Sequence, residues 1–317
     1  MFANKFTKAV VFLTVLSVAL TSCGGASTKT QAPAKNDLLE KILARGTLVV
    51  ATDPAYPPQS ELIAGATRAA NTKCAPNEYT AAEFTGFDAA AATEVAKRLG
   101  VEACFVTPAW SQLIVGNWDG RWDISAGSMA LTPDRLSSLY FTQPYYATPA
   151  TMFVHKDNVS FSQPSDLSGK RIGVCTGCTY EEYLKGTLVI PGTKIDFTIK
   201  NAKIMGYDVD VPALEALSKG DGAVLDGALT SQPTGLQAIK DGMPLKQLGD
   251  PVFFEYLAMA TDQKSNYDSL SLAAKVSEII KQMHADKTLA KLSQKYYGID
   301  YANIASRFTV KSLGQLP

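Results

Sequence analysis

The feature that most constrains the fold of this chain is a repeated alternation of short helix and strand patterns. Residues 37–44 carry leucine and isoleucine at helical spacing, and the apolar run 47–51 that follows predicts a buried strand. Residues 87–99 predict a helix that ends at Gly100, and 101–106 predict the next strand. Such alternation is typical of βαβ units and mostly parallel sheets, so we expect an α/β fold.

The alternation continues to the end of the chain. It predicts helices at 111–116, 180–184, 211–218, 270–286 and 289–297, and strands at 122–129, 171–174 and 226–229. A polar stretch from 53 to 83 interrupts it and predicts a long surface excursion. Breaks in the pattern near His155 and Pro251 predict two lobes, which are a discontinuous lobe 1 (37–152 and 253–317) and lobe 2 (153–252).

The charge composition limits the partners of the chain. Thirty basic and thirty acidic side chains cancel in 317 residues, and no long run of either sign occurs. Nucleic-acid binders carry a basic face or stripe, so we expect no nucleic-acid partner.

The N-terminus predicts export. Lys5 and Lys8 precede an apolar run over 9–20, which ends at Leu-Thr-Ser-Cys with Cys23 last. The run is too short for a membrane span, and Cys23 has the setting of a bacterial lipoprotein cysteine. We therefore expect a lipoprotein signal peptide over 1–22, lipidation at Cys23, a flexible tether over 23–36 and an extracytoplasmic, lipid-anchored protein. The alternative is a plain signal peptide with an incidental cysteine.

Four cysteines remain after Cys23, namely Cys74, Cys104, Cys175 and Cys178. An even number in an oxidising compartment favours two disulfides. The C-x-x-C motif favours a Cys175–Cys178 bridge, which leaves Cys74 to pair with Cys104, although a reactive dithiol is the alternative. With two histidines and no second C-x-x-C, we expect no metal site.

Five segments occur in a fixed order along the chain. They are 46–58 (GTLVVATDPAYPP), 86–100, 123–146 (beginning DISAGSMALTPDR), 166–179 and the closing helical segment 283–298. Together they resemble the amino-acid-binding, family 3, solute-binding proteins of bacterial ABC transporters. The resemblance implies a two-lobed periplasmic-binding-protein-like fold of type II. Each lobe would be a mostly parallel sheet flanked by helices, and a two-strand hinge would join the lobes.

The resemblance also implies a ligand-binding set. Arg135 would grip a solute carboxylate with its fork of donors, although a lone arginine is more often a solvated helix residue. Thr179, where a strand leads into a helix, would contact the same carboxylate from lobe 2, or act only as a helix cap. The remaining members are Tyr56 and Trp110, which would flank the solute side chain, and Ser128, Met129 and Ala130, which would contact the solute largely through the backbone.

One position departs from the family pattern. The motif over 225–231 (LDGALTS) has Ser231 where the family usually supplies an aspartate for the α-ammonium group. An ammonium group facing only a hydroxyl would be poorly compensated. Either another acid serves, with Asp208, Asp210 and Glu61 as candidates, or the solute lacks a charged nitrogen.

The sequence therefore predicts a binding protein and not an enzyme. It would capture a small carboxylate-bearing solute, an amino acid in the first instance, by lobe closure and deliver it to an ABC transporter permease. We expect a monomer without cofactor or metal. The alternatives are an enzyme on the same fold, similar to cyclohexadienyl dehydratase, and a solute sensor for a membrane signalling partner.

Overall fold

The computed structural model describes residues 36–308 and 313–316, which belong to one compact unit. The predicted signal peptide, Cys23 and nearly all of the predicted tether lie outside the described residues. The elements in chain order are α1 (Leu38–Arg45), β1 (Thr47–Ala51), β2 (Ala55–Tyr56), β3 (Ser60–Leu62), β4 (Tyr79–Thr80), η1 (Ala81–Glu83), β5 (Phe84–Thr85), α2 (Phe87–Leu99), β6 (Glu102–Val106), α3 (Trp110–Leu113), β7 (Ile124–Ala130), α4 (Pro133–Leu136), β8 (Leu139–Phe141), β9 (Tyr146–His155), η2 (Pro164–Leu167), β10 (Arg171–Cys175), α5 (Thr179–Lys185), β11 (Lys203–Tyr207), α6 (Asp210–Leu217), β12 (Gly227–Ser231), α7 (Gln232–Lys240), β13 (Leu245–Asp262), α8 (Leu270–Ala285), α9 (Thr288–Tyr297) and α10 (Ala302–Ala305).

Local chemistry explains where the first helices begin and end. The Asp37 side chain accepts a hydrogen bond from the Glu40 backbone N–H, 3.0 Å away, and so caps the first turn of α1. Gly46 ends α1 in the left-handed conformation. Gly86 precedes α2 at a φ of 114°, and a Cβ atom there would lie 2.3 Å from the Gln59 carbonyl oxygen. Only glycine fits this approach.

Ten strands form a single mixed sheet, in the order β11-β10-β12-β9-β13-β7-β1-β6-β4, with β8 paired to β13. The β1 pairs with β6 and β7 are parallel, as are the β10 pairs with β11 and β12. The strands β9 and β13 are antiparallel to all of their partners and separate the two parallel groups. The predicted α/β class is confirmed, with the parallel groups joined through two antiparallel strands.

The apolar patterns did not predict the two long strands β9 and β13, although the family resemblance implied a two-strand connection between the lobes. The sequence predicted only an apolar stretch after Pro251, whereas β13 begins at Leu245 and runs for 18 residues. All ten residues of β9 are buried. A strand buried on both faces has no alternation of polar and apolar residues, so its sequence carries no period-2 signal.

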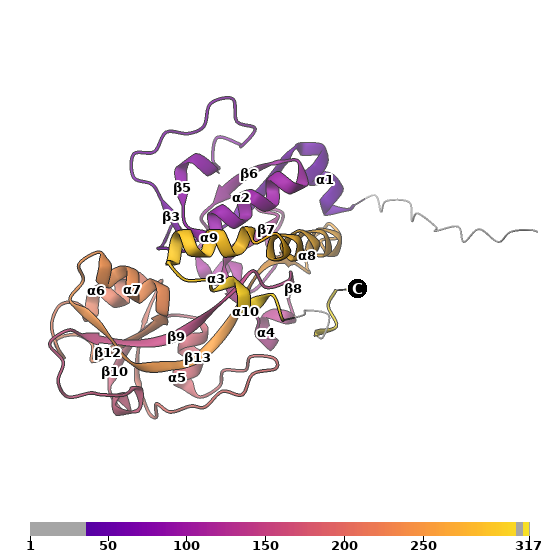
Figure 1. The fold of residues 1–317 in the computed structure, drawn as a ribbon. Coiled ribbons are helices and arrows are strands. Elements are labelled where there is room, and N and C mark those ends of the chain that lie inside the picture. The colour runs from indigo at the N-terminus through magenta and orange to yellow at the C-terminus, as the bar shows by residue number, and fades with distance from the viewer. Residues whose placement is uncertain (1–35, 309–312, 317) are drawn as a thin grey trace, which may run out of the picture. The chain divides into compact units, whose positions relative to one another are not determined.

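Each parallel group has its own hydrophobic cores. Two clusters of buried residues draw on 38–146 and 257–316, and two others draw on 150–253. No cluster of described residues mixes the two sets. We call the first set the outer half of the sheet, because its residues come from both ends of the described chain. We call the second set the middle half, because its residues come from the middle of the described chain. Figure 1 shows the early helices (indigo) beside the late helices α8 and α9 (yellow) in the outer half.

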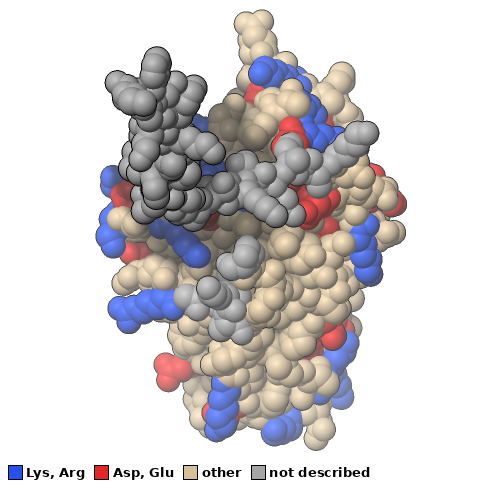
Figure 2. Space-filling view, turned by 90° about the vertical axis from the view of Figure 1, so that its right-hand side faces the viewer, with Lys and Arg blue, Asp and Glu red and all other residues tan. Residues whose placement is uncertain are grey.

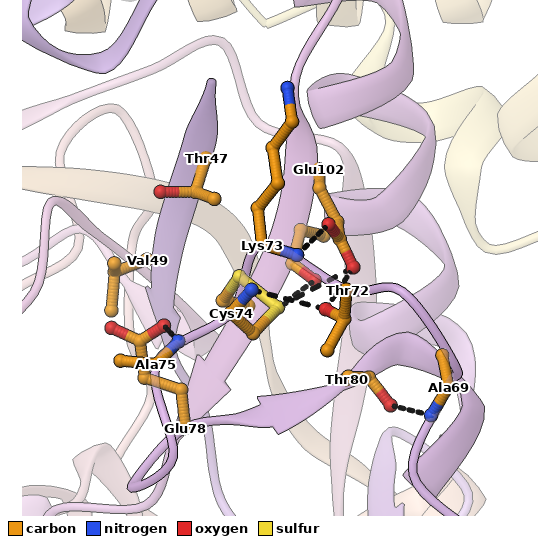
Figure 3. The surroundings of a disulfide bond; sticks show 12 residues. Thr47, Val49, Ala69, Thr72, Lys73, Cys74, Ala75, Glu78, Thr80 and Glu102 are labelled. Atoms are coloured by element: carbon orange, nitrogen blue, oxygen red, sulfur yellow. Dashed lines mark hydrogen bonds between the residues drawn. A yellow bond between two sulfur atoms is a disulfide. The ribbon is translucent and has the colours of Figure 1, made fainter. Parts of the chain in front are cut away.

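The polar stretch predicted as an excursion is tied down by a disulfide. Cys74 bonds to Cys104 on β6, and the Lys73 backbone N–H donates to the Glu102 carboxylate over 2.7 Å. Figure 3 shows these contacts, together with the hydrogen bond from the Thr72 hydroxyl to the same carboxylate. Short strands and this cross-link therefore help to order a segment that has few large apolar residues to bury.

Cys175 bonds to Cys178 in the middle half, so both predicted disulfides are confirmed. Charged side chains of both signs are interspersed on the face drawn in Figure 2 and form no single-sign patch there. Within the described part of the chain, no helix combines the length and apolar character that crossing a membrane requires.

The two disulfides differ in the loops that they close, which leads to a testable difference. The sequence separation is 30 for Cys74–Cys104 and 3 for Cys175–Cys178. Chain entropy gives a stabilisation of roughly 3–4 kcal/mol for the long loop and about 2 kcal/mol for the short one. Replacing Cys74 and Cys104 with alanine should therefore lower the free energy of unfolding more than replacing Cys175 and Cys178. Urea unfolding followed by tryptophan fluorescence measures both variants, and equal losses would contradict the expectation.

Candidate functional site

A pocket lies between the two halves of the sheet and has a volume of about 40 Å³. Its walls come from the loop after β1, from β2, α3, β7 and α4 in the outer half, and from β10, α5 and α6 in the middle half. The long strand β13 adds one further residue. The lining residues are Asp53, Tyr56, Trp110, Gly127, Ser128, Ala130, Arg135, Cys175, Cys178, Thr179, Tyr180, Asp208, Val209, Asp210 and Glu255.

Arg135 is the basic residue of this pocket, and its side chain is buried, with 5% exposure. It belongs to the short helix α4, which Thr132 precedes and Pro133 opens. The guanidinium donates to the Ala130 carbonyl and to the Gly177 carbonyl, each over 3.0 Å. The second bond crosses from the outer to the middle half. Burial lowers the pKa of Arg135, but a guanidinium stays charged in proteins.

Aromatic side chains surround the guanidinium end of the pocket. The Arg135 guanidinium lies 5.2 Å from the centre of the Trp110 ring, within cation–π distance. The buried Trp110 Nε1 forms no hydrogen bond with the described residues. Across the pocket, the hydroxyls of Tyr56 and Tyr180 lie 3.5 Å apart, one from each half. The predicted members Tyr56 and Trp110 therefore both reach the pocket.

Ser128 and Ala130 also line the pocket, whereas Met129 does not. The Met129 side chain is fully buried in a core of the outer half, as expected for alternate residues of the strand β7. Ser128 has a φ of 53°, uncommon for a residue other than glycine. Its hydroxyl donates to the Asp88 carboxylate and lies 2.6 Å from the Tyr146 hydroxyl.

Asp88 anchors that network from beneath the pocket. It is fully buried near the start of α2, and the Tyr145 hydroxyl donates to its carboxylate over 2.7 Å. No basic side chain in the described residues forms a salt bridge with Asp88. Burial raises the pKa of Asp88 to about 7, because a charged carboxylate loses its hydration there.

Glu255 is a pocket residue that the sequence analysis missed. It lies on β13, has 3% exposure, and accepts hydrogen bonds from the Thr179 hydroxyl (2.7 Å) and the Tyr180 hydroxyl (2.8 Å). Burial raises its pKa. The predicted residue Thr179, the first of α5, thus reaches the pocket and holds a carboxylate there. The sequence signal that could have identified Glu255 is a single glutamate within the otherwise apolar run 252–260.

Three aspartates complete the acidic lining. Asp210, the first residue of α6, is buried and accepts from the Thr230 hydroxyl, and burial raises its pKa to about 7. Burial likewise raises the pKa of Asp53 in the loop after β1. Asp208 lies at the exposed edge of the pocket. Of the three acids that the sequence proposed, Asp208 and Asp210 line the pocket, and Glu61 on β3 is exposed and does not.

Ser231 lies outside the pocket lining, in a buried neutral cluster. Its hydroxyl accepts from the Thr234 N–H at the start of α7 and lies 3.0 Å from the Gln59 side-chain amide. The same amide contacts the Thr234 hydroxyl. In this structure Ser231 therefore caps a helix and joins the two halves through neutral hydrogen bonds.

The cysteines do not provide thiolate ligands for a metal. Two groups of cysteine and acid side chains lie close together in the described residues, namely Cys74, Glu78 and Cys104, and Cys175, Cys178 and Asp210. In both groups the two sulfur atoms form a disulfide, which leaves one carboxylate in each. Metal ions bind the thiolate form of cysteine.

The chain resembles known proteins along most of its length. The family described as bacterial extracellular solute-binding proteins, family 3, matches residues 67–299. The L-cystine-binding protein TcyJ of Escherichia coli K12 is 27% identical over 287 residues, covering 90% of this chain and 94% of TcyJ. The probable amino-acid-binding protein YxeM of Bacillus subtilis is 28% identical over 219 residues, covering 69% of this chain and 78% of YxeM.

A solved structure gives the same result. An ancestral amino acid-binding protein, AncCDT-1, described as a precursor of cyclohexadienyl dehydratase, superposes with a TM-score of 0.64 at 27% identity. The superposition covers 82% of this chain and 99% of that protein.

The buried state of Asp88 predicts a pH dependence of stability. Its pKa rises from 3.8 to about 7 on folding, so the folded chain binds more protons than the unfolded chain between these values. The contribution of Asp88 to stability is therefore greatest below pH 4 and is lost as the pH rises to about 7. Asparagine does not titrate. As the pH rises from 4 to 8, the free energy of unfolding of Asp88→Asn should increase relative to that of the wild type by on the order of 4 kcal/mol.

Urea unfolding of both proteins across this pH range measures the difference. Other titrating groups, including Asp210, are common to both proteins and cancel. A difference that stays constant with pH would contradict the buried, uncompensated state of Asp88.

Proposed function

Because this chain belongs to the bacterial extracellular solute-binding proteins, family 3, we propose that it captures an amino acid in the pocket around Arg135 and delivers it to an ABC transporter permease. The names of TcyJ and YxeM support an amino acid as the solute. The observation that carries the proposal is a buried guanidinium in a pocket between the two halves, without a salt bridge to any described carboxylate. A buried charge of this kind favours a ligand of opposite charge.

The solute carboxylate is proposed to bind at Arg135. The planar fork of a guanidinium matches the two oxygens of a carboxylate, and the Trp110 ring supports the guanidinium from one face. Backbone groups of Ser128 and Ala130 and the start of α5 at Thr179 complete the anion site. Tyr56 and Trp110 flank the side chain of the solute. Met129 and Ser231 act indirectly in this proposal, through the core of the outer half and through the contact between the halves.

Capture requires that the halves separate, since a volume of about 40 Å³ holds only a few water-sized molecules. We propose that β9 and β13 form the hinge. The lobes are then 37–152 with 253–317, and 153–252. The separate hydrophobic cores support this division, because each lobe keeps its own core during the motion.

The chain is a binding protein and not an enzyme, in line with its named relatives. The same names do not favour a dehydratase-like enzyme or a sensor. We propose that the chain acts as a monomer without cofactor or metal.

Replacing Arg135 with alanine should abolish binding. The loss of a buried partner for a carboxylate costs about 2–5 kcal/mol, which is at least about 30-fold in affinity. Calorimetric titration with the standard amino acids and cystine measures the affinity, after unfolding and refolding to remove any bound solute.

Arg307→Ala is the matched control, because Arg307 is exposed and far from the pocket lining. A thermal melt establishes that each variant is folded. Wild-type affinity in a folded Arg135→Ala protein would overturn the proposed site.

The family places the chain outside the cytoplasm, and we propose that a lipid on Cys23 anchors it to the membrane. The sequence up to Cys23 supports this proposal. In the producing bacterium, Cys23→Ala should move the protein from the membrane fraction to the extracytoplasmic soluble fraction, and should remove palmitate labelling. Unchanged membrane fractionation of the variant would count against the anchor.

A further inference from the structure

The pocket holds more negative than positive charge. Besides the exposed Asp208, three carboxylates enter it from three different places, Asp53 from the loop after β1, Asp210 from the start of α6 and Glu255 from β13. The exposures of Asp210 and Glu255 are 6% and 3%. Arg135 is the one basic residue of the lining. A solute that pairs its carboxylate with Arg135 therefore leaves three acids to face its remaining groups.

Within the described part of the protein these acids form no salt bridge, although the nearby Arg135 charge favours the charged form of Glu255. No lysine, arginine or histidine there forms a salt bridge with any of the three. Glu255 and Asp210 are held instead by neutral hydroxyls, of Thr179, Tyr180 and Thr230. Hydroxyl donors orient a buried carboxylate but do not balance its charge.

Ser231, at the position where the family resemblance leads us to expect an acid, lies outside the pocket lining. Ser231, Gln59 and Thr234 bond to one another in a buried cluster outside the pocket lining. The acidic side chains of this pocket therefore lie away from Ser231. Besides the exposed Asp208, they are Asp53, Asp210 and Glu255, which line the pocket together.

We infer that the solute is a cationic amino acid, with one carboxylate and a second basic group, and that Asp53, Asp210 and Glu255 select it. The inference rests on the proposed function, because it assumes that Arg135 binds the solute carboxylate. A neutral amino acid brings a single ammonium group to three carboxyl groups. A second basic group on the side chain offsets the charge of a second carboxylate.

The same acids link solute charge to closure of the lobes. Asp53 belongs to the outer half and Asp210 to the middle half, and each raises the energy of the other's charged form. Closing the lobes without a cation therefore brings like charges together. A cation between these acids reverses the sign of the interaction, so it stabilises the closed form.

Proton release on solute binding measures this balance of charge in the pocket. The titratable groups that face Asp210 are Asp53, Glu255, Tyr56 and Tyr180, and none is basic. Burial and this repulsion raise the pKa of Asp210 to about 7. A bound cation favours the charged carboxylate, so its binding near pH 7 should release protons.

Matched pairs of solutes provide the test. Arginine and citrulline have nearly the same shape and differ in side-chain charge. Lysine and norleucine have the same carbon chain and differ only in the terminal ammonium group of lysine. We expect the cationic member of at least one pair to bind the wild-type protein at least about 100-fold more tightly by calorimetry. Titration at pH 7 in two buffers of different ionisation enthalpy should show proton release with that cationic member only.

Variants then assign the selectivity to residues. Glu255→Gln and Asp210→Asn should each reduce the affinity ratio within the pair at least about tenfold. Glu215→Gln is the control, because Glu215 is an exposed acid on the same helix as Asp210 and does not line the pocket. A thermal melt excludes unfolded variants, and the wild-type ratio does not depend on the variants.

The outcomes separate the two proposals. Tight binding of citrulline, cystine or another neutral amino acid, without preference for the cationic member of either pair, overturns the cationic inference and leaves the proposed function standing. A preference that survives in both folded variants overturns the role of Asp210 and Glu255. Binding of no amino acid by the wild-type protein overturns the proposed function, and the inference with it.

Discussion

The pairing of β9 with β13 is the constraint on which the rest of the structure depends. These two strands pair over most of their length and pass from one group of parallel strands to the other. They allow each half to keep a complete core, while both halves contribute to the pocket. They also carry Glu255 directly into the pocket wall. A connection through a flexible linker would leave the relative position of Arg135 and Thr179 undefined.

The pocket concentrates charges that a folded protein normally avoids burying. Arg135, Asp210 and Glu255 are each more than nine-tenths buried. Desolvation lowers the pKa of the arginine and raises the pKa of both acids, so in each case burial disfavours the charged form. In the proposed function, such a site is unfavourable when empty and becomes favourable when a solute of complementary charge binds. The free energy lost by burying these charges would then contribute to affinity and selectivity.

Asp88 shows how the core supports the pocket from behind. Its carboxylate accepts hydrogen bonds from Tyr145 and from Ser128, and the latter residue lines the pocket in a left-handed conformation. A buried carboxylate with two directed donors fixes the Ser128 side chain. This arrangement places a titratable carboxylate, Asp88, in the core of the outer half. Asp88 belongs to the segment 86–100, which carries part of the family resemblance.

The sequence by itself determined the local elements and the α/β class. The helix at 87–99 and the strand at 47–51 follow from apolar spacing and from Gly46 and Gly100, and they have these bounds in the structure. The C-x-x-C spacing and cysteine count gave the two disulfides. The length of β13 was not predicted, because Gly249, Pro251 and a break in register between Leu248 and Phe253 interrupt its strand pattern. The position of Glu255 in the pocket depends on how this strand packs.

Only the tertiary structure decided which acids meet. Asp53, Asp210 and Glu255 are far apart in the sequence and share no motif. They come together because the loop after β1, the start of α6 and the long strand β13 meet where the two halves close on each other. Ser231, which the sequence placed in the site, is instead held by Gln59 and Thr234. The charge of the pocket is thus a property of the packed chain, since charges interact through space and not along the sequence.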